Sequence, residues 1–295
     1  MSKLFSVIIP TYNRAEQIRN NLDHLANQTF KNFEVWVCDD GSEDDTKNIV
    51  DSYKESLDIN YLWFENWGGP ARPRNEGIKR CTGKWICFLD SDDWWYPEKL
   101  EQVSKYVDSY DLIYHQLDII STKNTGKKVS EPLQENVLTD LLVNGNRLAN
   151  SSVCVKKSIL DAVGQLSEDK DLIAMEDYDL WIRVASITKQ FKFIEQSLGA
   201  YNWGDGSNIS HISLERIRKE QIIFNKHILL LNDDDQKEAK RILDYKIGRY
   251  YSVLGMYAES VSCLKNAFLS RSFKMKLKAT IFFTQSYLSF LFKGG

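Results

Sequence analysis

The sequence has 295 residues, which is enough for one large domain, or a domain with an appendage, around an ample core. Hydrophobic residues make up 43% and charged residues 27%, and 38 basic residues against 41 acidic ones give a net charge of −3. This balance argues against wholesale nucleic-acid binding, which needs a basic surplus.

The five cysteines are odd in number and scattered, and none has zinc-ligand spacing or forms a Cys-x-x-Cys pair. This usage indicates a reducing compartment. Residues 1–3 lead directly into a strand-like run, so no signal peptide is expected, and no apolar stretch reaches the roughly 18 residues that span a membrane. We therefore expect a cytosolic protein, either away from membranes or with its tail at the inner face of the plasma membrane.

The first hundred residues alternate between strand-like and helical patterns. Apolar runs that predict strands are followed each time by segments with helical spacing of apolar residues. The predicted strands cover residues 4–9, 33–38, 59–64 and 84–89, and the predicted helices cover residues 15–27, 45–53 and 73–80. A strand that alternates with a helix is typical of a parallel sheet, so this part reads as a doubly wound nucleotide-binding half.

Two of these strands end in acidic clusters, residues 39–42 (Asp-Asp-Gly-Ser) and residues 90–93 (Asp-Ser-Asp-Asp). The carboxyl ends of parallel strands meet at one edge of the sheet, where ligands bind in open α/β folds. Crowded carboxylates favour a cation, and Mg²⁺ is usually held by one or two carboxylates together with phosphates. The alternatives are an ordinary turn at residues 39–42 and a helix cap by Asp92 ahead of Pro97 and Glu98.

The middle of the chain is less regular. Residues 111–114, 151–155 and 191–194 resemble strands, and residues 137–142 and 158–164 resemble short helices. Residues 176–184 begin a helix with Glu176, Asp177 and Asp179, which either complement the positive helix N-terminus or aim a carboxylate at a cleft. A glycine-rich loop then leads to His211, which is either a ligand of phosphate or metal or an incidental surface residue.

From about residue 214 the chain reads as helical, with a helical hairpin predicted around Gly255. The final segment combines a basic stretch, residues 271–278, with an apolar one, residues 281–292. Such a segment lies at a membrane interface beside anionic lipids, or packs on the rest of the protein as a last helix.

Five motifs in this order resemble glycosyltransferase family 2, whose members have the GT-A fold. They are residues 6–14 (SVIIPTYNR), 39–46 (DDGSEDDT), 74–78 (RNEGI), 90–93 (DSDD) and 176–181 (EDYDLW). Pro73 stands where the family usually has alanine. Each motif is weak alone, but the set is specific and covers residues 4–181. The expected fold is α/β, a mostly parallel central sheet flanked by helices with a C-terminal helical extension.

The resemblance implies a site for a nucleotide-sugar donor. Asp92 would hold Mn²⁺ or Mg²⁺ against the diphosphate, with His211 as a further candidate ligand. The residues implied to bind the nucleotide are Pro10, Thr11, Tyr12, Arg14, Asp39, Asp40, Gly41, Arg74, Asp90 and Ser91. Carboxylates accept hydrogen bonds from N–H groups of a base and hydroxyl groups of ribose, and arginine forms bidentate hydrogen bonds with phosphate.

The resemblance also assigns the acceptor side of the reaction. Asp177 would be the base that removes the acceptor proton, and Glu176 would support it. Asp93, Trp94 and Trp181 are candidate contacts to the sugars. Residues 1–212 would form the catalytic domain, with a nucleotide-sugar half to about residue 100 and an acceptor half beyond it, and residues 213–295 a helical region.

The sequence thus predicts an inverting, metal-dependent enzyme that transfers one sugar to a glycan acceptor. The expected donor is a nucleotide-diphospho-sugar, and a UDP-sugar is preferred among these. The expected acceptor is a lipid-linked glycan. The Gln-x-x-Arg-Trp motif of processive relatives is absent, which favours addition of a single sugar. Two other functions compete with this one. A metal-dependent nucleotidyltransferase also gathers aspartates at strand ends, and a scaffold that binds sugar or nucleotide without catalysis would keep the fold.

Overall fold

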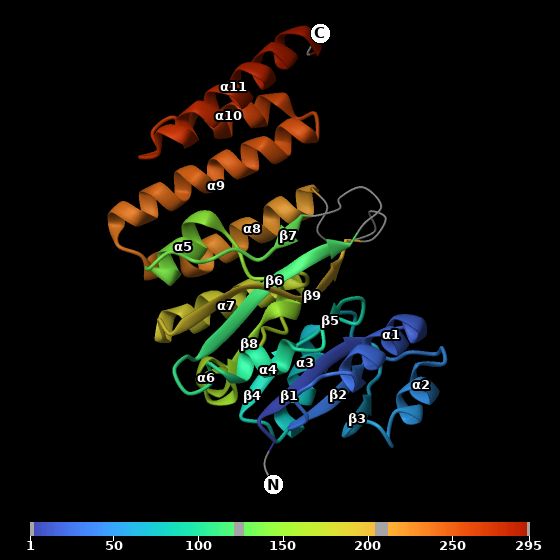
Figure 1. Ribbon diagram of the computed structural model, residues 1–295. Helices are drawn as coiled ribbons and strands as arrows, with labels where there is room; N and C mark the ends of the chain where they lie inside the picture. Colours follow the sequence, from blue (N-terminus) through green and yellow to red (C-terminus); the bar gives the residue numbers. More distant parts are fainter. Residues whose placement is uncertain (1–2, 121–126, 204–211, 294–295) are drawn as a thin grey trace. The chain divides into compact units, whose positions relative to one another are not determined.

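The computed structural model describes residues 3–120, 127–203 and 212–293 (Figure 1). The chain divides into two compact units. Residues 1–137 and 146–208 form the first unit, and residues 138–145 and 209–295 form the second. The candidate site lies entirely in the first unit.

The first unit is built on a mixed sheet with the strand order β3-β2-β1-β4-β8-β6-β9-β5, and β7 pairs with β6. Strands β3, β2, β1 and β4 are parallel, as are β6 and β9, whereas β8, β5 and β7 run antiparallel to their neighbours. The strands are β1 Phe5–Thr11, β2 Phe33–Asp39, β3 Ile59–Trp63, β4 Trp85–Phe88, β5 Trp94–Trp95, β6 Leu112–Ile120, β7 Lys128–Val129, β8 Cys154–Lys156 and β9 Phe191–Asn202. The predicted α/β class with a mostly parallel sheet is confirmed.

Helices connect these strands. They are α1 Ala15–Ala26, α2 Thr46–Ser52, α3 Ala71–Arg80, α4 Lys99–Ser104, α6 Lys157–Val163 and α7 Glu176–Ile187. The spacing that predicts α1 places Ile18, Leu22 and Leu25 on one face, and all three are completely buried against the sheet. Gly164 ends α6 in the left-handed region, with φ 86°, as glycine does at many helix ends.

The start of α4 corrects one prediction. This helix begins at Lys99 with Glu98 in the capping position, several residues after Asp92. The helix-cap alternative for Asp92 is therefore wrong, because the chain first forms the short strand β5 between that carboxylate and the helix.

The second unit is helical. It contains most of α5 (Val137–Asn144), together with α8 Leu214–His227, α9 Asp233–Val253, α10 Tyr257–Ala267 and α11 Phe273–Lys293. The predicted hairpin is confirmed, since α9 and α10 pack together with Gly255 between them at φ 76° (Figure 1). The core of this hairpin and α11 includes Tyr245, Leu264, Ala267 and Ala279. Among the described residues, no helix is both long and apolar enough to cross a membrane.

Candidate active site

Asp39 and Asp40, at the end of β2, organise the loops around them. Asp39 is completely buried, and its carboxylate accepts from the backbone N–H of Ser42 at 2.7 Å and the hydroxyl of Tyr61 at 2.6 Å. Asp40 accepts from three successive backbone N–H groups, at residues 67–69, over 2.9 to 3.3 Å. Their carboxylates are thus engaged within the protein, where they hold the loops at the end of β2 in place.

Gly41 follows these aspartates with φ 94°, a conformation that favours glycine. A Cβ at this position would lie 2.9 Å from the backbone nitrogen of Asn66, so a side chain does not fit. The turn after β1 packs alongside, because Asn13 N–H donates to Ser42 Oγ at 2.8 Å. Pro10 and Thr11, at the end of β1, are buried, whereas Tyr12, on the turn, is 49% exposed and open to a ligand.

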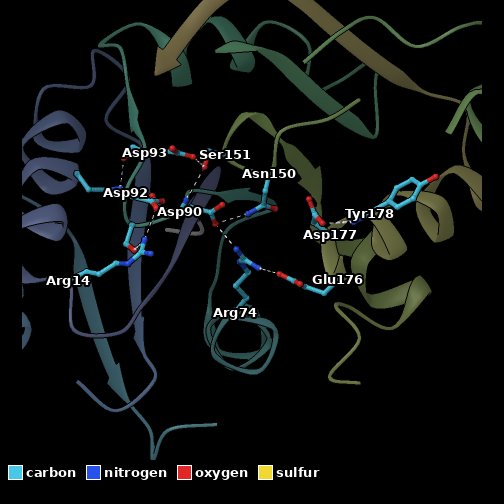
Figure 2. A network of polar contacts seen from close by, with 12 residues as sticks. Arg14, Arg74, Asp90, Asp92, Asp93, Asn150, Ser151, Glu176, Asp177 and Tyr178 are labelled. Atoms are coloured by element: carbon cyan, nitrogen blue, oxygen red, sulfur yellow. Dashed lines mark hydrogen bonds and ion pairs between the residues drawn. The ribbon is translucent and has the colours of Figure 1, made fainter. Parts of the chain in front are cut away.

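The carboxylates of the β4–β5 loop point to different partners (Figure 2). Asp90 accepts from Arg74 Nη2 at 2.5 Å and from Asn150 Nδ2 at 2.9 Å. Asp92 pairs with Arg14 at 2.7 Å, while Ser91 is buried beside this pair. Asp90 and Asp92 are each partly exposed, so solvent reaches both side chains.

Asp93, the third carboxylate, is 2% exposed. It accepts from Ser151 Oγ at 2.5 Å and from the backbone N–H of Asn202 at 2.9 Å. Burial, together with Asp90 and Asp92, raises the pKa of Asp93 well above its usual value. Both of its carboxylate oxygens are engaged inside the protein, which argues against the predicted contact with a sugar. The hydrogen bonds of Asp93 instead connect the β4–β5 loop to β9.

Arg74 links the β4–β5 loop to the helix that carries Glu176 and Asp177. Its guanidinium is 4% exposed and donates to Asp90 on one side and to Glu176 Oε1, at 2.7 Å, on the other (Figure 2). Arg74 Nε and Glu176 Oε2 have no hydrogen-bond partner among the residues that the structure describes. Buried polar atoms are almost always paired, so these two free atoms mark a place where a ligand can bind.

Asp177 lies at the first turn of α7, next to this network. Its carboxylate accepts from the backbone N–H of Tyr178 at 2.7 Å and from Asn146 Nδ2 at 3.2 Å. Burial raises the pKa of Asp177 to about 7, with a further contribution from the neighbouring Glu176. A carboxylate with this pKa accepts a proton more readily than an ordinary aspartate does, which suits a general base near neutral pH.

Asn150 and Ser151 were not among the predicted site residues, yet the structure places both in it. Asn150 donates to Asp90 and keeps Oδ1 without a partner. Ser151 Oγ accepts from the backbone N–H of Asp90 at 3.0 Å and donates to Asp93. Their sequence signal is only a short polar stretch before a strand, which ordinary turn residues also produce.

The two candidate tryptophans differ in placement. Trp94 is partly exposed and stacks on His24, with ring centroids 5.9 Å apart. Trp181 is completely buried and packs edge-on against Phe88. Its ring faces are therefore not available to a sugar, and Trp181 supports the site from the core instead.

A divalent metal fits this site only with help from a ligand. In the described part of the chain, no three His, Cys, Asp or Glu residues gather as a metal-binding group. Asp92 nevertheless has a partly exposed carboxylate that already attracts a cationic side chain, and one carboxylate plus phosphate oxygens is a donor set that Mg²⁺ accepts. The other predicted ligand, His211, lies outside the described residues.

The model of "Glycosyl transferase family 2" matches residues 6–160 of this chain. The chain belongs to glycosyltransferase family 2. It is 34% identical over 210 residues to the amylovoran biosynthesis glycosyltransferase AmsB of Erwinia amylovora, covering 67% of this chain and 69% of that protein. The five predicted motifs thus lead to the right family, and this family 2 enzyme is a glycosyltransferase.

Solved structures have the same fold. The structure of residues 1–349 of TarS from Staphylococcus aureus in complex with UDP-GlcNAc matches with a TM-score of 0.71 and 21% identity, covering 96% of this chain and 89% of that one. The mannosyltransferase PcManGT of Pyrobaculum calidifontis, in complex with GDP-Man and Mn²⁺, matches with a TM-score of 0.64 and 17% identity, covering 98% and 81%. At these identities the likeness establishes the GT-A fold of this glycosyltransferase.

Proposed function

We propose that this glycosyltransferase moves one sugar from a UDP-sugar to a hydroxyl group of a surface-glycan acceptor, with inversion at the anomeric carbon. The observation that carries this proposal is the position of Asp177, whose pKa is raised to about 7, directly beside the Glu176–Arg74–Asp90 network. A base and a phosphate-binding arginine are thus held in one network. The UDP preference is supported by the TarS complex with UDP-GlcNAc, and the surface glycan by the name of AmsB.

In the proposed reaction, the acceptor oxygen attacks the anomeric carbon as the bond from that carbon to the diphosphate breaks. Asp177 takes the acceptor proton, and Asn146 and the Tyr178 N–H orient its carboxylate. Glu176 holds the Arg74 guanidinium, whose free Nε is available to the donor. Thr11 and Asn150 offer further unpaired oxygens to hydroxyl or N–H donors of the substrate.

Asp92 is the proposed ligand of Mn²⁺ or Mg²⁺, which when bound would offset charge on the leaving diphosphate. The nucleotide would lie against residues 10–12, with Asp39, Asp40 and Gly41 shaping the loops around its base and Ser91 and Arg14 beside its phosphates. Residues 1–212 form the proposed catalytic domain. The metal role rests on the partly exposed carboxylate of Asp92 and on the Mn²⁺ complex of the similarly folded PcManGT.

A thermal-shift screen with UDP, GDP and dTDP, each with and without Mn²⁺, tests the proposal. We expect UDP to raise the melting temperature most, and more so with Mn²⁺. Asp92→Ala should remove the difference that Mn²⁺ makes, whereas Glu101→Ala, a carboxylate outside this network, should keep it. A stronger shift with GDP or dTDP would contradict the choice of donor, and no shift with any nucleotide would contradict the site.

We also propose that α11 brings the enzyme to a membrane, where a lipid-linked acceptor would be found. One face of α11, including Ala279, Phe282 and Ser286, packs within the second unit, while Phe273, Leu277, Ile281, Leu288 and Leu291 are exposed on the opposite face. Lys274, Lys276 and Lys278 are exposed beside this apolar stripe, and no acidic residue follows Glu259 in the sequence. An apolar face bordered by lysines fits the surface of a bilayer that contains anionic lipids.

Co-sedimentation with vesicles tests this contact. Binding is expected to vesicles that contain phosphatidylglycerol and to be weaker for pure phosphatidylcholine. The double variant Leu277→Glu/Ile281→Glu should release the protein, whereas Leu229→Glu, at an exposed site outside α11, should not. A stable dimer in solution that the double variant dissolves would show that a second copy covers this face instead. The free state of all five cysteines supports a setting on the cytoplasmic side.

A further inference from the structure

A charged side chain without a carboxylate partner lies in the interior of the first unit. Lys99 is completely buried. Its Nζ lies 2.9 Å from Cys154 Sγ and 3.4 Å from the centroid of the Trp95 ring, and no ion pair joins it to a carboxylate in the described part of the chain. A buried ammonium group costs several kcal/mol unless a negative charge compensates it. Among the residues that the structure describes, the Cys154 sulfur is the group placed to carry that charge.

The thiol of Cys154 faces a second thiol, that of Cys87, on the neighbouring strand. Cys87 on β4 lies directly opposite Cys154 on β8, and both are completely buried. The next pair along is joined by a hydrogen bond from Phe88 N–H to Val153 O, so Cys87 and Cys154 occupy a non-hydrogen-bonded position, where facing side chains approach most closely.

The two thiols differ in how readily they lose a proton. Burial acts to raise the pKa of Cys154, but the neighbouring Cys87 thiol and the ammonium of Lys99 bring it down to about 7. Burial and the neighbouring Cys154 raise the pKa of Cys87 well above its usual value. His115, which also faces this cluster, stays neutral because burial and Lys99 lower its pKa to about 3. Cys154 is therefore the sulfur that loses its proton more readily, and it lies beside a thiol that keeps its proton.

The two cysteines lie close in sequence to residues of the proposed donor site. Cys87 is on the strand that leads into Asp90, and Cys154 follows the segment that contains Ser151. Ser151 Oγ accepts from the Asp90 N–H, and its carbonyl accepts from Trp95 Nε1 at 2.7 Å. Because the same tryptophan ring lies under Lys99, a change at the sulfurs reaches the Asp90 loop through packed neighbours.

We propose that Cys154 and Cys87 form an oxidation site, at which hydrogen peroxide converts the pair to a disulfide and weakens donor binding. The Cys154 thiolate attacks a peroxide oxygen, an S–O bond forms, and the O–O bond breaks with release of hydroxide. The Cys87 sulfur then attacks Cys154 Sγ, the S–S bond forms, and the hydroxyl group leaves with the Cys87 proton as water. The two sulfurs lose two electrons, and the peroxide gains them.

Counting thiols tests the chemistry independently of the enzyme's function. Cys263→Ser is the background, because Cys263 is half-buried and the other four cysteines are buried. The folded protein is treated with hydrogen peroxide, freed of excess oxidant, denatured and titrated. We expect four thiols to fall to two and dithiothreitol to restore four, with a Cys87–Cys154 cross-linked peptide in the mass spectrum. Four thiols after treatment, or a disulfide between other cysteines, would overturn the proposal.

Matched variants test the roles of the residues. Cys154→Ser should abolish disulfide formation, and Cys38→Ser, at an equally buried cysteine, should leave its rate unchanged. Lys99→Met removes the ammonium but keeps an unbranched side chain, and should slow the reaction by about tenfold or more because less thiolate is present. A Lys99→Met variant that oxidises at the original rate would overturn the role of the ammonium. If that variant does not fold, the ultraviolet absorbance of the thiolate tests the ionisation of Cys154 directly: Cys154→Ser should lose it, and unchanged absorbance would overturn the proposal.

The effect on the donor rests on the proposed function. UDP affinity should fall severalfold after oxidation and recover with dithiothreitol. Unchanged affinity in protein shown to contain the disulfide would overturn the link to the donor site. If UDP binds neither form, the proposed function fails, while the thiol counts still decide the oxidation chemistry.

Discussion

Arg14 and Asp92 form an ion pair, with 2.7 Å between the guanidinium Nη1 and the carboxylate Oδ2. Arg14 lies on the turn between β1 and α1, and Asp92 lies in the β4–β5 loop, so the pair joins the ends of two neighbouring strands. The two side chains are 42% and 28% exposed, so water screens their attraction. A protein cation thus already compensates the carboxylate that is proposed to hold the metal.

Replacement of Arg14 should therefore change metal binding. In Arg14→Met, Mn²⁺ should bind more tightly in the absence of nucleotide, because it no longer competes with a guanidinium for Asp92. The gain should be at most about fivefold, since an exposed pair contributes about 0–1 kcal/mol. Titration calorimetry with Mn²⁺ measures it. Arg19→Met, which removes an exposed partner of Glu16 on the same helix, is the control. Equal or weaker Mn²⁺ binding in Arg14→Met would contradict this competition.

Removal of Arg74 should destabilise the fold as well as the site. Arg74→Met leaves Glu176 with a buried charge and no counter-ion, and such a loss costs about 3–5 kcal/mol. Urea denaturation measures the free energy of unfolding. The double variant Arg74→Met/Glu176→Gln should regain much of the loss, because neither charge is then left alone. A double variant as unstable as the single one would show that the guanidinium acts through packing.

Much of the first unit could be predicted because it depends on local patterns. The buried residues of α1 recur at helical spacing, and the apolar runs that form β1, β2 and β4 each end at a polar cluster. Parallel pairing then brings these ends to one edge whatever the details of the loops. The family motifs lie at this edge, which is why candidate residues chosen from the sequence alone lie close together in the structure.

The roles of the individual carboxylates depend on partners that the sequence does not indicate. Asp39, Asp40 and Asp93 look as available as Asp92 in the sequence, yet each is satisfied by N–H or O–H donors inside the fold. Asn150 was missed for the same reason, since its contact with Asp90 joins residues 60 positions apart. Which acid faces a ligand is decided by tertiary hydrogen bonding and not by spacing.

Glu34 should stabilise the protein in a pH-dependent way. It is 5% exposed and accepts from Ser6 Oγ at 2.7 Å and from the backbone N–H of Thr82 at 2.6 Å. Burial acts to raise its pKa, but these hydrogen bonds outweigh burial and lower it below the usual value. A lowered pKa contributes stability above the unfolded-state pKa, and that stability is lost as the pH falls through the folded-state pKa.

Glu34→Gln should therefore cost about 1–3 kcal/mol of unfolding free energy at pH 7, and the difference from the unaltered protein should shrink below pH about 4. Chemical denaturation at a series of pH values measures this. Glu16→Gln, at an exposed side chain, should change little at any pH. A cost for Glu34→Gln that is the same at every pH would mean that the ionised carboxylate is not what stabilises these loops.

Asp177 should set the acid limb of the pH–activity profile. A base must be ionised to take the acceptor proton, and the pKa of Asp177 is raised to about 7. Below that pH, kcat/KM should therefore fall about tenfold for each pH unit. Asp177→Asn should lose about 10²–10⁴-fold in kcat, and its residual rate should lack this limb. UDP release measured across pH tests both expectations, and unchanged turnover in Asp177→Asn would exclude Asp177 as the base.

The same carboxylate should make a measurable difference to stability, with the opposite sign to Glu34. Because the folded-state pKa of Asp177 is raised, folding favours its protonated form, and its ionisation opposes folding as the pH rises from about 4 towards 7. Asp177→Asn cannot ionise, so its melting temperature should exceed that of the unaltered protein at pH 8 and converge with it near pH 4. Asp169→Asn, at an exposed side chain, is the control. A melting-temperature gap that does not depend on pH would show that Asp177 titrates as an ordinary aspartate.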